Sequence, residues 1–120
     1  VANTVAYTRQ REAFGKPLFA LQNTRFKLAE CQTQAVVART FVDRCLEMHM
    51  QGQLDANDAA MAKLHVTETL GKVLDECLQL HGGYGYMWEY PIARAWAGHR
   101  VSRIAGGSSE IMKEIISRTL

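Results

Sequence analysis

The sequence predicts an all-α domain of the up-and-down four-helix-bundle type, built on two long antiparallel helices. Apolar and small residues recur every seven positions from Leu21 to His49, which makes one amphipathic stripe of about seven helical turns. A second stripe, from Ala59 to Leu80, advances by threes and fours and keeps one apolar face along its whole length. No strand signal competes anywhere, and no internal repeat is visible.

The elements before and between these stripes follow from local signals. Residues 1–11 read as a helix that begins in the middle of its pattern, so we expect a first helix whose initial turns are missing. Gly52 is a stop signal for the first long helix. Asp55 and Asp58 then supply an N-cap and a first-turn acid for the second, so a tight turn joins the two.

Glycine punctuates the second half of the chain. The second long helix is expected to end at His81-Gly82-Gly83, before an aromatic-rich connection over residues 84–91. Pro91 suits the first turn of a shorter helix that continues to Arg100. Residues 106–110 (Gly-Gly-Ser-Ser-Glu) then break the chain and cap a last helix, expected over residues 111–120.

Length and composition bound the class of protein. The 120 residues, 48% hydrophobic and 22% charged, suit one globular domain, taken as residues 1–120. No apolar run approaches the roughly 20 residues needed to cross a bilayer, so we expect no membrane insertion. The net charge of +2 is spread along the chain without a basic stripe, which argues against nucleic acid as a partner.

The cysteines and the first residue give two further indications, one of the cellular compartment and one of the length of the parent protein. Cys31, Cys45 and Cys77 fall inside helical patterns without metal-site spacing, so they are interpreted as reduced core thiols in a reducing compartment. The chain opens on Val1 rather than Met and shows no signal peptide, which suggests a fragment of a longer protein.

Residues 106–110 are the strongest candidate binding site on residue chemistry alone. Paired glycines let a backbone approach a ligand closely, and the free N–H groups of a helix N-terminus attract an anion such as a phosphate or diphosphate. The competing interpretation is an ordinary helix cap, which is the commoner use of such a sequence.

Two other segments could also approach a ligand. Residues 80–85 (Leu-His-Gly-Gly-Tyr-Gly) could come close to one, or could simply form a glycine C-cap and a turn. Residues 9–17 (Arg-Gln-Arg-Glu-Ala-Phe-Gly-Lys-Pro) place two arginines and an aromatic ring beside a glycine that ends the first helix, a combination able to hold a nucleotide. A solvated basic helix end is the alternative.

Metal binding is not expected. The four histidines, at positions 49, 65, 81 and 99, share no helical face, and the Glu-x-x-His pairs of a di-iron bundle are missing. No nucleophile elbow, Walker loop or Cys–His pair is present either.

Several motifs taken together resemble the acyl-CoA dehydrogenases, in order and at family spacing. They are Tyr-Thr-Arg-Gln-Arg-Glu-Ala-Phe-Gly-Lys-Pro-Leu at 7–18, Gln22, Gln-Leu-His-Gly-Gly-Tyr-Gly-Tyr at 79–86, Glu-Tyr-Pro at 89–91 and Gly-Ser-Ser-Glu-Ile at 107–111. The stretch from Gly83 to Pro91 is most similar to the long-chain branch of the family.

The resemblance implies a C-terminal helical domain that contacts FAD in two places. The residues implied to meet the FAD of a neighbouring subunit are Arg11 at its diphosphate, Phe14 at its nucleotide end, Gln22 near its adenine, and the loop of Gln79, Leu80, His81, Gly82 and Gly83. The residues implied to meet the FAD of their own subunit are Ser108, Ser109 and Glu110, with Gly107 beside the substrate thioester.

The departures from the family pattern concern catalysis and one ion pair. Many members carry a catalytic glutamate where this chain has Gly106, and a glycine cannot act as a base. In the long-chain and isovaleryl branches the base comes from the helix that enters the bundle, here upstream of Val1. Glu110 matches a flavin-contacting position and is given little weight as the base. Residues 97–100 (Ala-Gly-His-Arg) replace a common Arg-Asp pair, which puts a structural ion pair in doubt.

The resemblance therefore implies the C-terminal domain of an enzyme that dehydrogenates acyl-CoA thioesters at the α,β bond with FAD. It implies an electron-transfer flavoprotein as partner, a homodimer or homotetramer, and residence in a bacterial cytoplasm or a mitochondrial matrix. The 120 residues alone are expected to be inactive. The alternatives are an acyl-CoA oxidase or flavin monooxygenase of the same superfamily, a non-catalytic helical assembly module and, more distantly, a di-metal bundle.

Overall fold

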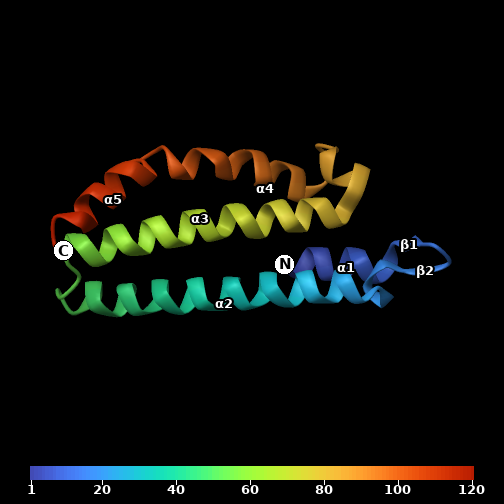
Figure 1. Ribbon diagram of the computed structural model, residues 1–120, viewed down its shortest axis with the longest axis horizontal. Coiled ribbons are helices and arrows are strands. Elements are labelled where there is room, and N and C mark those ends of the chain that lie inside the picture. The colour runs from blue at the N-terminus through green and yellow to red at the C-terminus, as the bar shows by residue number, and fades with distance from the viewer.

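A computed structural model describes all residues, 1–120, as a bundle of helices around one central helix (Figure 1). The helices are α1 (Ala2–Gln10), α2 (Gln22–Met50), α3 (Ala56–His81), α4 (Pro91–His99) and α5 (Ser109–Ser117). The long helices α2 and α3 are antiparallel, and α4 and α5 run back along the other side of α3. Helix α1 lies against α3 near the point where α2 begins. This arrangement confirms the all-α prediction.

The predicted apolar stripes hold α2 and α3 together, with three local exceptions. Leu28, Ala38 and Cys45 of α2 are buried at the expected spacing, but His49 at the end of the stripe is exposed. On α3 Ala59 is exposed and the buried line begins at Ala60, and Leu70 further along the stripe is 42% exposed.

The turn between the long helices follows the predicted signals. Gly52 adopts a φ of 69°, a left-handed conformation that glycine enters at no steric cost. Asp55 is the N-cap of α3, and its Oδ1 accepts a hydrogen bond of 2.7 Å from the Asp58 amide. The carboxylate thus satisfies one of the free donors at the start of the helix.

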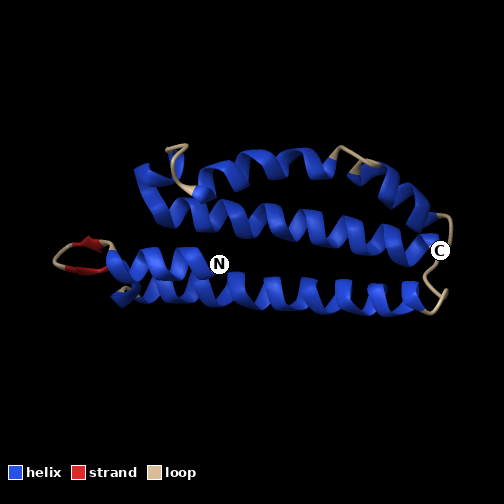
Figure 2. Cartoon of the chain, turned by 180° about the vertical axis from the view of Figure 1, so that it is seen from behind, coloured by secondary structure: helices blue, strands red, loops and turns tan.

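A short hairpin after α1 contradicts the expectation that the chain contains no strand. Strands β1 (Glu12–Ala13) and β2 (Lys16–Pro17) pair antiparallel, and they are the only strands of the chain (Figure 2). Phe14 and Gly15 connect them with φ values of 55° and 74°, both positive as in a type I′ turn. Two-residue strands are too short to leave an alternating pattern. Gly15 therefore forms a hairpin turn instead of ending α1.

The second half of the chain matches the glycine and proline signals closely. Gly82 ends α3 with a φ of 57° and opens a short 3₁₀ segment, Gly82–Tyr86. Pro91 occupies the first turn of α4, which a second 3₁₀ segment, Arg100–Arg103, follows. Helix α5 begins at Ser109, two residues before the predicted start, because the Ser108 hydroxyl caps it. It also ends at Ser117, short of the predicted Leu120.

The cysteines are free and buried, which agrees with their interpretation as core thiols. Cys31, Cys77 and Val73 form the cluster between α2 and α3. Burial, with Cys77 alongside, raises the pKa of the Cys31 thiol to about 11. None of the helices combines the length and apolar character that a membrane crossing requires.

Candidate functional site

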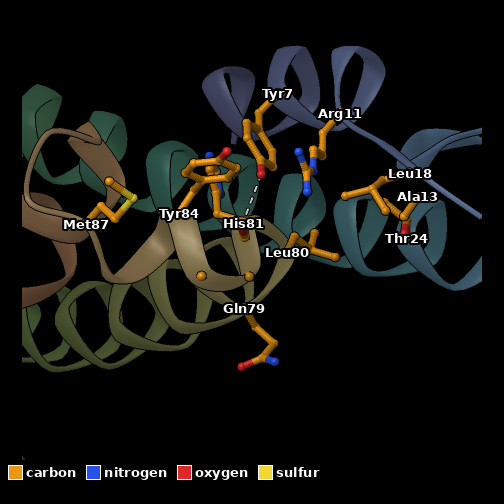
Figure 3. Close-up of a pocket in the computed structure, with 12 residues that line it drawn as sticks. Tyr7, Arg11, Ala13, Leu18, Thr24, Gln79, Leu80, His81, Tyr84 and Met87 are labelled. Atoms are coloured by element: carbon orange, nitrogen blue, oxygen red, sulfur yellow. Dashed lines mark hydrogen bonds between the residues drawn. The ribbon is translucent and has the colours of Figure 1, made fainter.

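Six of the sequence-predicted residues converge on one open cavity of about 700 Å³ where α1, α2 and the end of α3 meet (Figure 3). They are Arg11, Gln79, Leu80, His81, Gly82 and Gly83. Two segments that are 68 positions or more apart in sequence thus line the same cavity. We call this region, with the rings of Tyr7, Tyr84 and Tyr90, the aromatic end of α3.

Tyr7 fixes the start of the glycine loop. Its hydroxyl donates a hydrogen bond of 3.1 Å to the carbonyl of His81, and the two rings stack with centroids 4.2 Å apart. The buried His81 ring donates through Nδ1 to the Cys77 carbonyl at 2.8 Å. Burial raises the pKa of Tyr7 above its ordinary value, against the lowering effect of Arg11. Stacked rings and two hydrogen bonds to backbone carbonyls therefore hold the last turn of α3.

Arg11 brings a cation to the cavity without a carboxylate partner. It follows the last turn of α1, its guanidinium lies 5.3 Å from the Tyr84 ring centroid, and it takes part in no ion pair. A Cβ added at Gly82 or Gly83 would meet no atom within 4 Å, so the loop has open space beside it. The Gln79 side chain extends away from Tyr7 and Arg11 (Figure 3).

Two predicted residues of this group lie outside the cavity lining. Phe14 stands at the hairpin tip with 91% of its surface exposed, and Gln22 is the exposed first residue of α2. Neither is brought into contact with the glycine loop. Phe14 is also the one non-glycine residue with a positive φ.

Ser108, Ser109 and Glu110 lie against the N-terminal half of α3, roughly 20 Å from His81 as judged by the helical rise between Glu68 and His81. Glu68 of α3 accepts hydrogen bonds from the Ser109 hydroxyl at 2.8 Å and from Arg103 at 3.1 Å. The Ser109 bond first, and then Arg103, lower the pKa of Glu68. We call this region, with Lys63 and residues 106–110, the charged end of α3.

The turn before α5 has an unusual backbone. Gly106 and Gly107 adopt φ values of 63° and 97°, and a Cβ at Gly107 would lie 2.6 Å from the Met112 methyl. Lys63 Nζ donates to the carbonyls of Ala105, at 2.9 Å, and of Gly107. No backbone carbonyl of the chain accepts a hydrogen bond from the amides of Gly106, Gly107 or Ser108.

The carboxylates near Gly106 have lowered pKa values. The amide of Glu110 and the Ser108 hydroxyl lower the pKa of the Glu110 carboxyl. Glu68 is held by Ser109 and Arg103. A carboxylate with a lowered pKa is a weak general base, so neither group suits proton abstraction.

Hydrogen bonds rather than an ion pair attach helix α4 to α3. His99 Nε2 donates to the Thr67 carbonyl at 2.8 Å, and Gly71 leaves room for the ring, since a Cβ there would lie 3.4 Å from Nε2. Trp96 Nε1 donates to Asp75 at 3.0 Å. These two hydrogen bonds join α4 to α3, whereas residues 97 and 98 carry no charge and cannot form an ion pair.

Sequence reasoning missed the residues that hold both ends. Tyr7 was quoted only as part of a motif, and Lys63 and Glu68 were assigned no role. Their charge alone was no signal, because Lys63 lies at the edge of the apolar stripe of α3 and Glu68 on the opposite face, where charged residues are ordinary. Their partners lie 35 to 44 positions away, so no local spacing reveals them.

Comparisons with known proteins agree with this geometry. The family model "Acyl-CoA dehydrogenase, C-terminal domain" matches residues 1–120. The long-chain specific acyl-CoA dehydrogenase of mouse mitochondria is 51% identical over 114 residues, which cover 95% of this chain and 26% of that protein.

Solved structures show the same fold. A crystal structure of an acyl-CoA dehydrogenase from Geobacillus kaustophilus superposes with a TM-score of 0.95 at 47% identity, covering 98% of this chain and 31% of that one. The FAD complex of PigA superposes with a TM-score of 0.89 at 30% identity, over 98% and 31% of the two chains. The chain thus spans about a quarter to a third of the relatives it matches. It belongs to the acyl-CoA dehydrogenase family, whose C-terminal helical domain it represents.

Proposed function

We propose that residues 1–120 are the C-terminal domain of a longer FAD-dependent enzyme that dehydrogenates acyl-CoA thioesters at the α,β bond. The observation that carries the proposal is the convergence of six residues, implied by resemblance to contact FAD, on a single cavity at the aromatic end. The similarity of the motif over residues 83–91 favours a long-chain type of enzyme, and 51% identity to the mouse long-chain enzyme supports it.

The aromatic end fits the diphosphate and nucleotide part of FAD from a partner subunit. Arg11 is a cation without a carboxylate partner, and a guanidinium binds phosphate oxygens bidentately. Gly82 and Gly83 leave open space for close approach. Phe14 and Gln22, exposed outside the cavity, would contact the nucleotide and adenine beyond it.

The charged end fits the FAD of its own subunit. The unbonded amides of Gly106, Gly107 and Ser108 precede the N-terminus of α5, where Ser109 and Glu110 complete the first turn. In this proposal Gly107 lies beside the substrate thioester. Bound FAD would accept the hydride from the β-carbon, and the task of these residues is to position flavin and thioester.

The general base is proposed to lie outside residues 1–120. Gly106 has no side chain, Glu68 accepts hydrogen bonds that lower its pKa, and the neighbouring amide and Ser108 hydroxyl lower the pKa of Glu110. A glutamate on the helix that enters the bundle before Val1 would abstract the α-proton. Residues 1–120 alone should therefore be inactive.

The wider setting follows from the same proposal. The enzyme would be a homodimer or homotetramer, because the two ends of α3 would serve FAD molecules of different subunits. An electron-transfer flavoprotein would reoxidise it, in a bacterial cytoplasm or a mitochondrial matrix.

The test uses the full-length protein whose coding sequence contains this chain. Purified protein should carry FAD, and anaerobic addition of acyl-CoA thioesters of increasing length should bleach the flavin absorbance, most effectively with long chains. Reoxidation is then compared with electron-transfer flavoprotein and with oxygen. The 120-residue chain is the control and should give no acyl-CoA-dependent flavin reduction.

The outcomes separate the alternatives. Rapid reoxidation by oxygen would indicate an acyl-CoA oxidase or a monooxygenase. A full-length protein that binds no flavin, and has no glutamate in the preceding helix, would indicate an assembly module. Flavin reduction by the 120-residue chain would overturn the placement of the base.

A further inference from the structure

We propose that Lys63 is a positioning residue that sets the shape of the Gly106–Gly107 turn and thereby aligns the start of α5 with the flavin and the thioester. The inference rests on the proposed function, because the turn matters to catalysis only if it faces those groups. Its grounds are the two carbonyls that Lys63 binds, the glycine conformations between them and the amides left unbonded.

Lys63 connects two elements that are far apart in sequence. It lies in the second turn of α3, and its Nζ donates to the carbonyls of Ala105 and Gly107, the residues on either side of Gly106. It is partly buried and takes part in no ion pair. The charge is therefore directed at the turn, where bonds from an ionised donor are about twice as strong as neutral ones.

The two bonds constrain the turn in one particular shape. Both glycines adopt positive φ values. Glycine has more accessible backbone conformations than any other residue, so its φ and ψ angles are not fixed by its own sterics. A Gly-Gly turn without an anchor would sample several of these conformations. Because Lys63 binds the carbonyl on each side of Gly106, it removes most of this freedom before any ligand arrives.

The same bonds leave the amides of the turn available. Those of Gly106, Gly107 and Ser108 donate to no backbone carbonyl. The carbonyls of the turn are bound by Lys63 of α3, while its amides remain free to donate. Such an arrangement fixes hydrogen-bond donors in place before a ligand binds. Glu68 adds a second tie, five residues further along α3, through the Ser109 hydroxyl. Lys63 thus orients the turn, and Glu68 orients the first residue of α5.

The position of Lys63 suits this role in a chain with glycine at position 106. A Cβ at Gly106 would lie 4.0 Å from Lys63 Cε, so the lysine stem passes directly beside the turn. A loss of its bonds would move the turn rather than remove a reacting group. We therefore expect an effect on catalytic turnover with little effect on substrate affinity.

The experiment compares Lys63→Met and Lys63→Gln with Lys72→Met in the full-length flavoprotein. Lys72 is an exposed lysine on the same helix, nine residues on and on the opposite face, with no hydrogen bond or ion pair. The measurements are kcat and KM for an acyl-CoA, the flavin absorbance spectrum and the flavin reduction potential. Folding is checked by circular dichroism and by oligomeric state.

Both Lys63 variants should lose roughly 10- to 100-fold in kcat, as expected for a misplacement of about 1 Å, with KM changed less than about twofold. The flavin spectrum and potential should shift in both, and Lys72→Met should match wild type. The glutamine side chain is one atom shorter than lysine and uncharged, but it is polar and favours a helix. The Lys63→Gln variant therefore provides the test if Lys63→Met fails to fold.

Folded Lys63 variants with wild-type kcat and flavin spectrum would overturn the inference, and so would a rise in KM without a fall in kcat. A wild-type protein without FAD, or without acyl-CoA-dependent flavin reduction, would instead overturn the proposed function. The two failures are therefore distinguishable.

Discussion

The two ends of α3 hold their glycine loops by different forces. At the aromatic end, Tyr7 stacks on His81 and donates to its carbonyl, and the loop after Gly82 is shaped by close packing. At the charged end, ionised Lys63 and Glu68 hold the loop of the left-handed Gly106 and Gly107 through hydrogen bonds. One end therefore depends on shape and the other on ionised hydrogen bonds.

This difference predicts how each end fails. Packing against backbone atoms leaves no room for an added methyl group. Hydrogen bonds to or from ionised side chains weaken when a partner loses its charge. Three pairs of substitutions follow, from the largest expected effect on stability to the smallest, and the first two pairs separate these responses.

Gly85→Ala should produce the largest loss of stability. Gly85 is buried, and an added Cβ would lie 2.5 Å from the Leu78 carbonyl oxygen and 3.2 Å from His81 Cβ. Because a backbone atom cannot swing aside, the last turn of α3 must move, at a cost near the upper end of the roughly 1–3 kcal/mol typical of overpacking. Thermal unfolding of the full-length flavoprotein, followed by flavin release, measures the effect.

Gly98→Ala is the matched control. A Cβ at Gly98 in α4 meets no atom within 4 Å, so alanine there should be neutral or stabilise the helix by up to about 1 kcal/mol. Equal melting temperatures for Gly85→Ala and wild type would show that the aromatic end adjusts to the added methyl group without cost. That result would contradict the claim that this end depends on close packing.

The sequence predicted the helices well because their signals are local. The apolar stripes, the Asp55 cap, the Gly82 stop and Pro91 all act within a few residues of where they stand. The hairpin at Phe14 was missed because its strands have two residues each. The anchors of both loops were missed for another reason. Tyr7 with His81, and Lys63 with Gly107, are pairs that only the assembled fold brings together.

Glu68→Gln should weaken the charged end in a pH-dependent way. The bonds from Ser109 and Arg103 lower the pKa of Glu68, so its ionised form contributes stability at pH values above the unfolded pKa of about 4.3. That contribution is lost as pH falls through the lower, folded pKa. Since the Arg103 and Glu68 side chains are 33% and 35% exposed, the deficit of the variant at pH 7 should be about 1 kcal/mol or less.

Unfolding is measured from pH 7 down to pH 3 for wild type, Glu68→Gln and Tyr7→Phe. The deficit of Glu68→Gln should shrink as wild-type Glu68 becomes protonated. Tyr7→Phe keeps the ring but loses a hydrogen bond worth about 0.5–1.5 kcal/mol, and because neither the Tyr7 hydroxyl nor the His81 carbonyl changes charge over this range, the loss from that bond should not depend on pH. Parallel pH curves for the two variants would show that ionised Glu68 does not stabilise the charged end.

Phe14→Asn should have the smallest effect on stability, and it tests whether the exposed hairpin belongs to the aromatic end in function. Phe14 has a φ of 55°, a conformation that asparagine adopts more readily, so the variant should be unchanged or more stable by less than about 1 kcal/mol. An exposed phenylalanine in a costly conformation indicates a selected contact. We therefore expect Phe14→Asn to release FAD faster than wild type, and Phe14→Tyr, which keeps the ring, to release it at the wild-type rate. Equal FAD release from all three proteins would confine the aromatic end to the cavity of Arg11 and the glycine loop.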